Sequence, residues 1–166
     1  MTRFFRCVAM LAVVLLALSP AVCPPAFAAV PKKKSKVHWM DLKTALEKAK
    51  QNPKLIFVDL YADWCVPCRI MDANVYTDPT VASLLNSRFY AVKLDVESKE
   101  KISCDGEQKN VKDCMTQVWE LDILPSFVLL APKGLSILTV SDSMSPQEMQ
   151  DLLFKFLVKE EEWMKQ

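Results

Sequence analysis

The clearest strand-like hydrophobic pattern in the chain runs from Leu55 to Tyr61, where Asp59 is the one charged position. A short aliphatic and aromatic run of this kind predicts a strand that is buried on both faces. Asn52-Pro53 comes before it and is typical of a chain break. The segment Trp64-Cys65-Val66-Pro67-Cys68 follows it, so the strand is expected to lead two cysteines into the start of a helix.

Helical and alternating patterns elsewhere predict a mixed order of helices and strands. We expect Ile70 and Met71 to face inward from the helix that begins at Val66, and Ser145 to open the last helix through a capping box with Glu148. The expected order is a helix over 39–50, the strand 55–61, a helix over 66–76, a helix from 79, a strand over 90–96, a short helix over 116–121, strands 126–131 and 135–140, and the helix from 146.

The N-terminal segment has the composition of an export signal. Arg3 and Arg6 precede a twelve-residue apolar core from Cys7 to Leu18, and small residues at 26–28 suit a cleavage site. The sequence therefore predicts a signal peptide over 1–28, a basic linker over 29–36 and one domain over 37–166. An uncleaved N-terminal membrane anchor is the alternative. Export also predicts that the mature protein works in the bacterial periplasm.

The spacing of Cys65 and Cys68 suits thiol–disulfide exchange. Two cysteines three residues apart can close a disulfide across one helical turn. The helix N-terminus favours the thiolate of Cys65, which is the attacking species. Cys68 lies further into the helix and is expected to be more shielded, which suits the resolving role. Pro67 fits an early helical position because no N–H is needed there.

Zinc binding is the other common use of this cysteine spacing. It would need further ligands, but His38 is the only histidine and the remaining cysteines of the mature chain are Cys104 and Cys114. The sequence therefore predicts no metal and no cofactor.

The stretch Val58-Asp59-Leu60-Tyr61-Ala62-Asp63-Trp64-Cys65-x-x-Cys68 resembles the active-site strand and turn of the thioredoxin superfamily. It is most similar to the C-terminal periplasmic domain of DsbD-type thiol:disulfide interchange proteins. The resemblance implies an α/β, thioredoxin-like fold with a central mixed sheet flanked by helices. Residues 97–115 have no counterpart in a minimal member and read as an insertion.

The same resemblance implies roles for residues outside the Cys-x-x-Cys motif. Asp59 matches the family's buried acid, which moves a proton to or from the resolving cysteine, and Lys93 matches the lysine beside it. A purely structural ion pair at Asp59 is the alternative. Pro125, preceded by Leu124, matches the family's cis-proline. Together with Trp64 and Pro67, these two residues are expected to bind the substrate, although the sequence alone does not fix the isomer.

Cys104 and Cys114 lie in the predicted insertion, with nine residues between them. An even number of cysteines in an exported chain suggests two disulfides. We expect a structural disulfide here that stabilises the insertion. A second redox pair that exchanges with Cys65–Cys68 is the alternative.

These observations predict a periplasmic oxidoreductase that reduces disulfides of substrate proteins. Its electrons would come from a separate membrane donor of the DsbD or CcdA type, because the periplasm has no thiol buffer. A disulfide oxidase or isomerase of the same fold, or a redox-inert binding or chaperone module, are the alternatives. The net charge of +1 argues against a nucleic-acid partner, and we expect a monomer.

Overall fold

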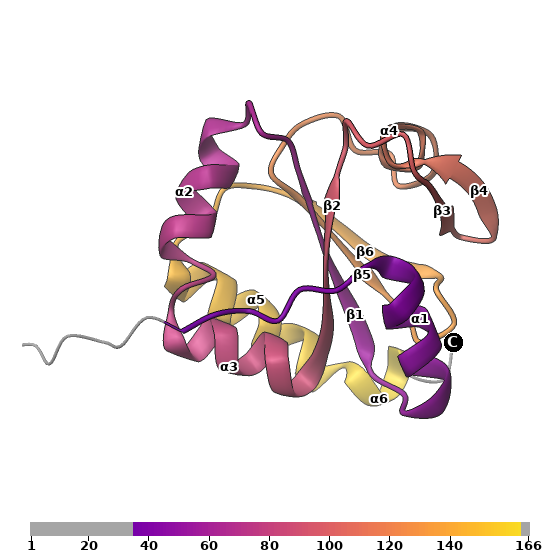
Figure 1. Cartoon of the computed structure of the whole chain (residues 1–166). Coiled ribbons are helices and arrows are strands. Elements are labelled where there is room, and N and C mark those ends of the chain that lie inside the picture. The colour runs from indigo at the N-terminus through magenta and orange to yellow at the C-terminus, as the bar shows by residue number, and fades with distance from the viewer. Residues whose placement is uncertain (1–34, 164–166) are drawn as a thin grey trace, which may run out of the picture. The chain divides into compact units, whose positions relative to one another are not determined.

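The structure is a computed structural model that describes residues 35–163, so the expectations for the signal peptide and most of the linker lie outside it. Its elements in chain order (Figure 1) are α1 (Leu42–Gln51), β1 (Leu55–Tyr61), α2 (Val66–Asn74), α3 (Pro79–Arg88), β2 (Phe89–Asp95), β3 (Lys101–Cys104), β4 (Glu107–Asn110), α4 (Val111–Asp113), the π-helical turn η1 (Cys114–Val118), β5 (Ser126–Leu130), β6 (Ser136–Ser141), α5 (Pro146–Val158) and α6 (Glu160–Trp163).

A four-stranded mixed sheet with the order β2-β1-β5-β6 forms the centre of the domain. β1 pairs with β2 in parallel and with β5 antiparallel, and β5 and β6 form an antiparallel hairpin. β1 is buried from Leu55 to Leu60 because it has a strand on each side and packed residues on both faces. The predicted central strand and the mixed thioredoxin-like sheet are thus confirmed.

Two hydrophobic clusters cover the two faces of this sheet. One contains buried residues of α2, α3 and α5, such as Met71, Leu85 and Leu153, packed on Phe57 and Phe127. The other contains residues of α1 and of the segment 96–121, packed on alternate residues of β1 and β2. The alternation of side chains along each strand therefore determines which residues meet the active-site helix and which meet the insertion.

Side-chain caps set the beginnings of three helices. Asp78 caps α3, and Ser145 caps α5 as predicted, with a complete Ser145–Glu148 capping box. The first helix begins later than predicted, at Leu42 rather than residue 39, because the Asp41 side chain accepts a hydrogen bond from the Thr44 N–H. The hydrophobic periodicity extends across Trp39, but the cap determines where the helix starts.

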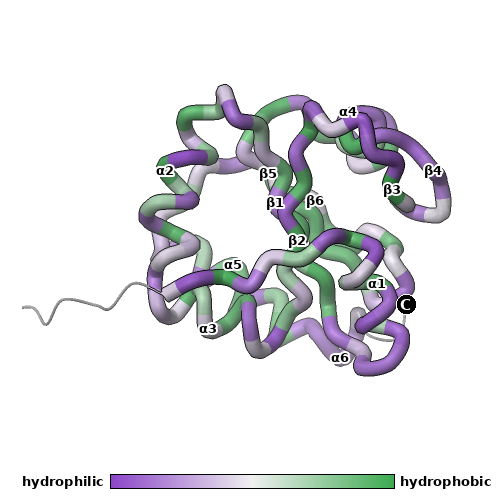
Figure 2. Tube along the Cα trace, in the orientation of Figure 1, coloured by the Kyte–Doolittle hydropathy of each residue, from purple (hydrophilic) through white to green (hydrophobic). Residues whose placement is uncertain are grey.

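The insertion is a hairpin, β3 and β4, followed by α4 and η1. Its two-residue turn, Asp105-Gly106, has positive φ angles of 48° and 90°, as tight hairpin turns require. The Asp105 carboxylate accepts hydrogen bonds from the backbone N–H and the hydroxyl of Ser136, so the turn is held against the start of β6. Figure 2 shows β4 in the hydrophilic colour, in agreement with its sequence Glu-Gln-Lys-Asn.

A disulfide joins Cys104, at the end of β3, to Cys114, at the start of η1. Both residues have 0% exposed surface and lie in the hydrophobic cluster that also contains Ile102, Val111 and Trp119. A disulfide in this position restricts the unfolded chain and keeps the insertion packed on the sheet.

Reduction of the Cys104–Cys114 disulfide should lower the free energy of unfolding by about 2–3 kcal/mol in the chain-entropy model. The measurement is urea unfolding of Cys65→Ser/Cys68→Ser protein, oxidised and reduced, so that only the Cys104–Cys114 bond differs. Identical unfolding curves for the two forms would contradict the stabilising role.

Candidate active site

Cys65 and Cys68 form a disulfide at the N-terminus of α2, directly after β1 and a short turn. Cys65 is the N-cap residue, and its sulfur accepts a hydrogen bond from the Cys68 N–H at 3.2 Å. The free backbone N–H groups in the first turn of α2 would also stabilise a thiolate on Cys65 after reduction. In this disulfide form the two residues are almost equally covered, with 3% and 4% exposure, so the greater shielding expected for Cys68 is absent.

The Leu124–Pro125 peptide bond is cis, and it precedes β5. Ser126 pairs with Leu60 in the antiparallel register, which brings Pro125 next to the end of β1 where the cysteine turn begins. The Ser126 hydroxyl, itself buried, donates to the Ile123 carbonyl oxygen at 2.6 Å and so holds the proline loop. Leu124 packs against the hydrophobic cluster that contains both cysteines.

Exposed apolar side chains belong to the segments around the disulfide. Trp64, Val66 and Ile70 lie on the turn and on α2, and Ile123 precedes the cis-proline; they are between 54% and 65% exposed. The prediction that Ile70 faces inward was wrong: only Met71 does, and Ile70 projects to the surface. Helical spacing allowed either residue to be buried, and the sheet lies on the Met71 side. Sequence reasoning missed Ile70 and Ile123 as members of this surface.

Asp59 is a carboxyl group inside the sheet, with 3% exposure, and it pairs in register with Lys93 on β2. Burial raises the pKa of Asp59 to about 6, against the partial opposing effect of the Lys93 charge. The Lys93 ammonium lies 3.6 Å from an Asp59 oxygen. A carboxyl with a pKa near 6 can gain and lose a proton near neutral pH, as a general acid or base must.

Lys93 has a second carboxylate partner, Asp72 on α2, with which it forms a short ion pair. Its ammonium also lies 4.7 Å from the ring centroid of Tyr61, 5.5 Å from that of Trp39 and 5.7 Å from that of Tyr76. These cation–π contacts and the ion pair hold the lysine over the buried acid. Sequence reasoning missed Asp72, although its position four residues after Cys68 places it one helical turn further along.

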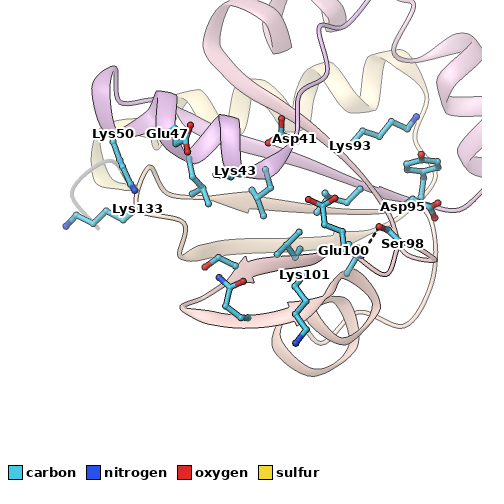
Figure 3. Close-up of a pocket in the computed structure, with 18 residues that line it drawn as sticks. Asp41, Lys43, Glu47, Lys50, Lys93, Asp95, Ser98, Glu100, Lys101 and Lys133 are labelled. Carbon is cyan, nitrogen blue, oxygen red and sulfur yellow. Dashed lines mark hydrogen bonds between the residues drawn. The ribbon is translucent and has the colours of Figure 1, made fainter.

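A hollow of about 630 Å³ lies away from the disulfide, between α1, β2 and the inserted hairpin (Figure 3). Its rim carries lysines and carboxylates together, among them Lys43, Glu47, Glu100 and Lys101. Lys93 also lines it, but its side chain extends away from the hollow toward Asp59. Charges of both signs give this surface no clear preference for one ligand class.

The described residues offer neither a metal site nor a membrane-spanning helix. Within residues 35–163, no three histidine, cysteine or acidic side chains are grouped so that they could hold a metal ion. In the same range no helix combines the length and the apolar character that a membrane crossing needs.

Comparison with curated proteins gives partial matches to DsbD-type proteins. Over 118 residues the chain is 32% identical to the thiol:disulfide interchange protein DsbD of Pectobacterium atrosepticum, which covers 70% of this chain and 18% of that protein. The chain thus spans less than a fifth of the length of this relative.

Solved structures support the fold. A thioredoxin from Thermus thermophilus matches with a TM-score of 0.59 and 23% identity, over 75% of this chain and 90% of that one. A protein named DsbH oxidoreductase matches with a TM-score of 0.55 and 15% identity, over 82% of this chain and 90% of that one.

The family model Thioredox_DsbH, described as "Protein of unknown function, DUF255", matches residues 29–160. This match covers the central sheet, the Cys65–Cys68 turn, the inserted hairpin and the whole of α5. The chain therefore belongs to the DsbH (DUF255) family of thioredoxin-fold proteins.

Proposed function

We propose that this protein reduces disulfides in substrate proteins outside the cytoplasm, with Cys65 and Cys68 as the reacting pair. The observation that carries the proposal is a Cys65–Cys68 disulfide at a helix N-terminus, beside a cis-proline and above a sheet that holds a carboxyl group with a pKa near neutrality. A redox-inert binding module would have no use for a buried acid whose pKa lies near 6.

In the reducing direction the reaction begins with both cysteines reduced. The Cys65 thiolate attacks one sulfur of the substrate disulfide, forming a mixed disulfide and releasing the other sulfur as a thiolate, which takes a proton. The Cys68 thiol then loses its proton to the Asp59 carboxylate and attacks the Cys65 sulfur. The Cys65–Cys68 disulfide forms, and the second substrate sulfur leaves as a thiolate that takes the proton held by Asp59. Two electrons and two protons have then passed to the substrate, the proton of the first thiol coming from solvent.

Charges around the cysteines support the reducing direction. Asp59 and Asp72 lie in one cluster with Lys93 as the shared cation, and Asp63 and Asp95 act on the neighbouring Tyr61 hydroxyl. Carboxylates near a Cys-x-x-Cys pair oppose the stabilisation of the thiolate by the helix N-terminus. A less stabilised thiolate means a less stabilised reduced form, which is typical of reductants rather than of strong oxidants such as DsbA.

The proposed periplasmic site determines what kind of protein must supply the electrons. The N-terminal segment 1–28 has the composition of a signal peptide, which supports a periplasmic site. A reductase there needs an electron donor in the membrane, because no thiol buffer keeps the periplasm reduced. We propose a separate membrane protein of the DsbD or CcdA type as this donor, and a monomeric domain that carries the electrons to substrates.

The complete burial of Cys104 and Cys114 favours a structural role for the second disulfide over electron transfer. Thiol–disulfide exchange needs the attacking thiolate to approach the sulfur in line, and neither sulfur is reachable without opening the insertion.

Reduction of insulin disulfides tests the proposed activity. The mature wild-type protein should accelerate the reaction, and Cys65→Ser should reduce the rate to that of the uncatalysed reaction because the attacking sulfur is lost. Cys68→Ser should accumulate a mixed disulfide with insulin, since no resolving thiol remains. The Cys104→Ala/Cys114→Ala variant is the control, and it should keep the wild-type rate at temperatures at which it stays folded. Absence of any wild-type activity would contradict the proposal.

Replacement of Asp59 should separate stability from activity. The pKa of Asp59 is 3.8 in the unfolded chain and about 6 in the folded one, so raising the pH through this window favours the unfolded state. Asp59→Asn should therefore raise the free energy of unfolding at pH 7 by about 2–3 kcal/mol, while leaving it nearly unchanged at pH 3.5. Insulin reduction at pH 7 should slow on the order of 10²-fold.

Urea unfolding at the two pH values checks the first effect, and the insulin assay the second. Equal stabilisation at pH 3.5 and pH 7 would assign the effect to packing rather than to the buried charge.

A further inference from the structure

Tyr76 is a buried tyrosine just beyond the active-site helix, with 3% exposure. Its backbone N–H donates to the Met71 carbonyl oxygen at 3.1 Å, which fixes the residue to the last turn of α2. Its ring packs edge to face against Trp39, with the ring centroids 4.9 Å apart. The main chain and the ring of Tyr76 are therefore each held in place.

Two buried side-chain polar atoms in the described residues have no hydrogen-bond partner. One is the Tyr76 hydroxyl and the other is the indole N–H of Trp119. A buried donor without a partner loses its hydration and gains nothing in return, whereas a phenylalanine of nearly the same shape would avoid this loss. A hydroxyl in such a place indicates a partner that it meets in another state of the site.

The charged groups around this hydroxyl come from three elements. Asp59 projects from β1, Lys93 from β2, and Asp72 from α2, and both carboxylates raise the pKa of the Tyr76 hydroxyl. Lys93 is shared between the two carboxylates, and its ammonium lies 5.7 Å from the Tyr76 ring centroid. Because Lys93 can only donate, the acceptor for the Tyr76 proton among these three groups is a carboxylate.

Of the two carboxylates, Asp59 is the better acceptor for Tyr76. Asp72 is 41% exposed at its side chain and is engaged by Lys93 at short range. Asp59 is buried, and Lys93 stays 3.6 Å away from it, which is longer than a hydrogen bond. The hydroxyl and the Asp59 carboxyl already act on each other: the interaction lowers the pKa of Asp59 and raises that of Tyr76.

We propose that Tyr76 is a positioning residue, whose hydroxyl donates a hydrogen bond to the ionised Asp59 carboxylate and holds it ready to take the proton of Cys68. This inference rests on the proposed reductase activity. In the step concerned, the Cys68 S–H bond breaks and an Asp59 O–H bond forms. Tyr76 keeps its own proton throughout, so protons and electrons balance as in the reaction above.

The hydrogen bond favours the charged form of Asp59, so its removal should raise the pKa of that carboxyl. Tyr76→Phe should move the acidic midpoint of the insulin-reduction pH profile upward by about one pH unit, which lowers the rate at pH 6 about fivefold and leaves it unchanged at pH 8.5. Tyr90→Phe is the matched control, because the Tyr90 hydroxyl donates to the Asn52 carbonyl oxygen at 3.0 Å, outside this cluster. Its profile should equal that of the wild type.

A double substitution makes the test specific. In an Asp59→Asn background, Tyr76→Phe should no longer change the pH profile, since no carboxylate remains to accept the bond. Three outcomes would each overturn the proposal. Tyr76→Phe could have an equal effect with and without Asp59, it could lower the rate uniformly at all pH values, or it could leave the pH profile unchanged.

A second readout does not depend on activity. The carboxyl carbon of Asp59, followed by NMR against pH in wild-type and Tyr76→Phe protein, should titrate at higher pH in the variant. If insulin is not reduced at all but this titration shifts, the proposed function fails and the Tyr76–Asp59 interaction stands. If insulin is reduced but the titration does not shift, the inference about Tyr76 fails alone.

Discussion

The burial of one carboxyl group, Asp59, is the constraint on which the site depends. The strand that carries it is covered on both faces, so its charge has to be compensated by groups from neighbouring elements. β2 contributes Lys93, α2 contributes Asp72 to hold that lysine, and aromatic rings from three segments enclose its ammonium. The compensation is incomplete, and the pKa of Asp59 remains near 6. In the proposed mechanism, the same incompleteness that destabilises the fold at neutral pH provides a base for the resolving cysteine.

Local sequence signals predicted the elements that position this site. The apolar run 55–61, the capping residue Ser145, and the proline before β5 each have one strong local explanation, and the structure agrees with them. Features that depend on tertiary packing were not predictable in this way. The orientation of Ile70 depends on where the sheet lies, and the contacts of Lys93 with Asp72 and Trp39 join residues far apart in the chain.

The inserted hairpin was recognised as an insertion but not as a hairpin. Its signal was Asp105-Gly106, a typical two-residue hairpin turn, but the flanking residues are too polar to suggest strands. Ile102, Cys104, Val111 and Cys114 provide its apolar side and bury it against the sheet, and the disulfide lies within that contact. The insertion thus extends the hydrophobic cluster on the face opposite α3 and α5, and it leaves the exposed apolar surface around Cys65 uncovered.

The central claim is that Cys65 and Cys68 transfer electrons to substrates while Cys104 and Cys114 do not. A redox titration of the mature protein, with alkylation and mass readout of each cysteine pair, tests it most directly. We predict a Cys65–Cys68 midpoint at about −250 mV or lower, with Cys104–Cys114 oxidised throughout. A midpoint between about −120 and −180 mV would reverse the proposed direction of electron flow, and a second pair that titrates together with the first would contradict its structural role.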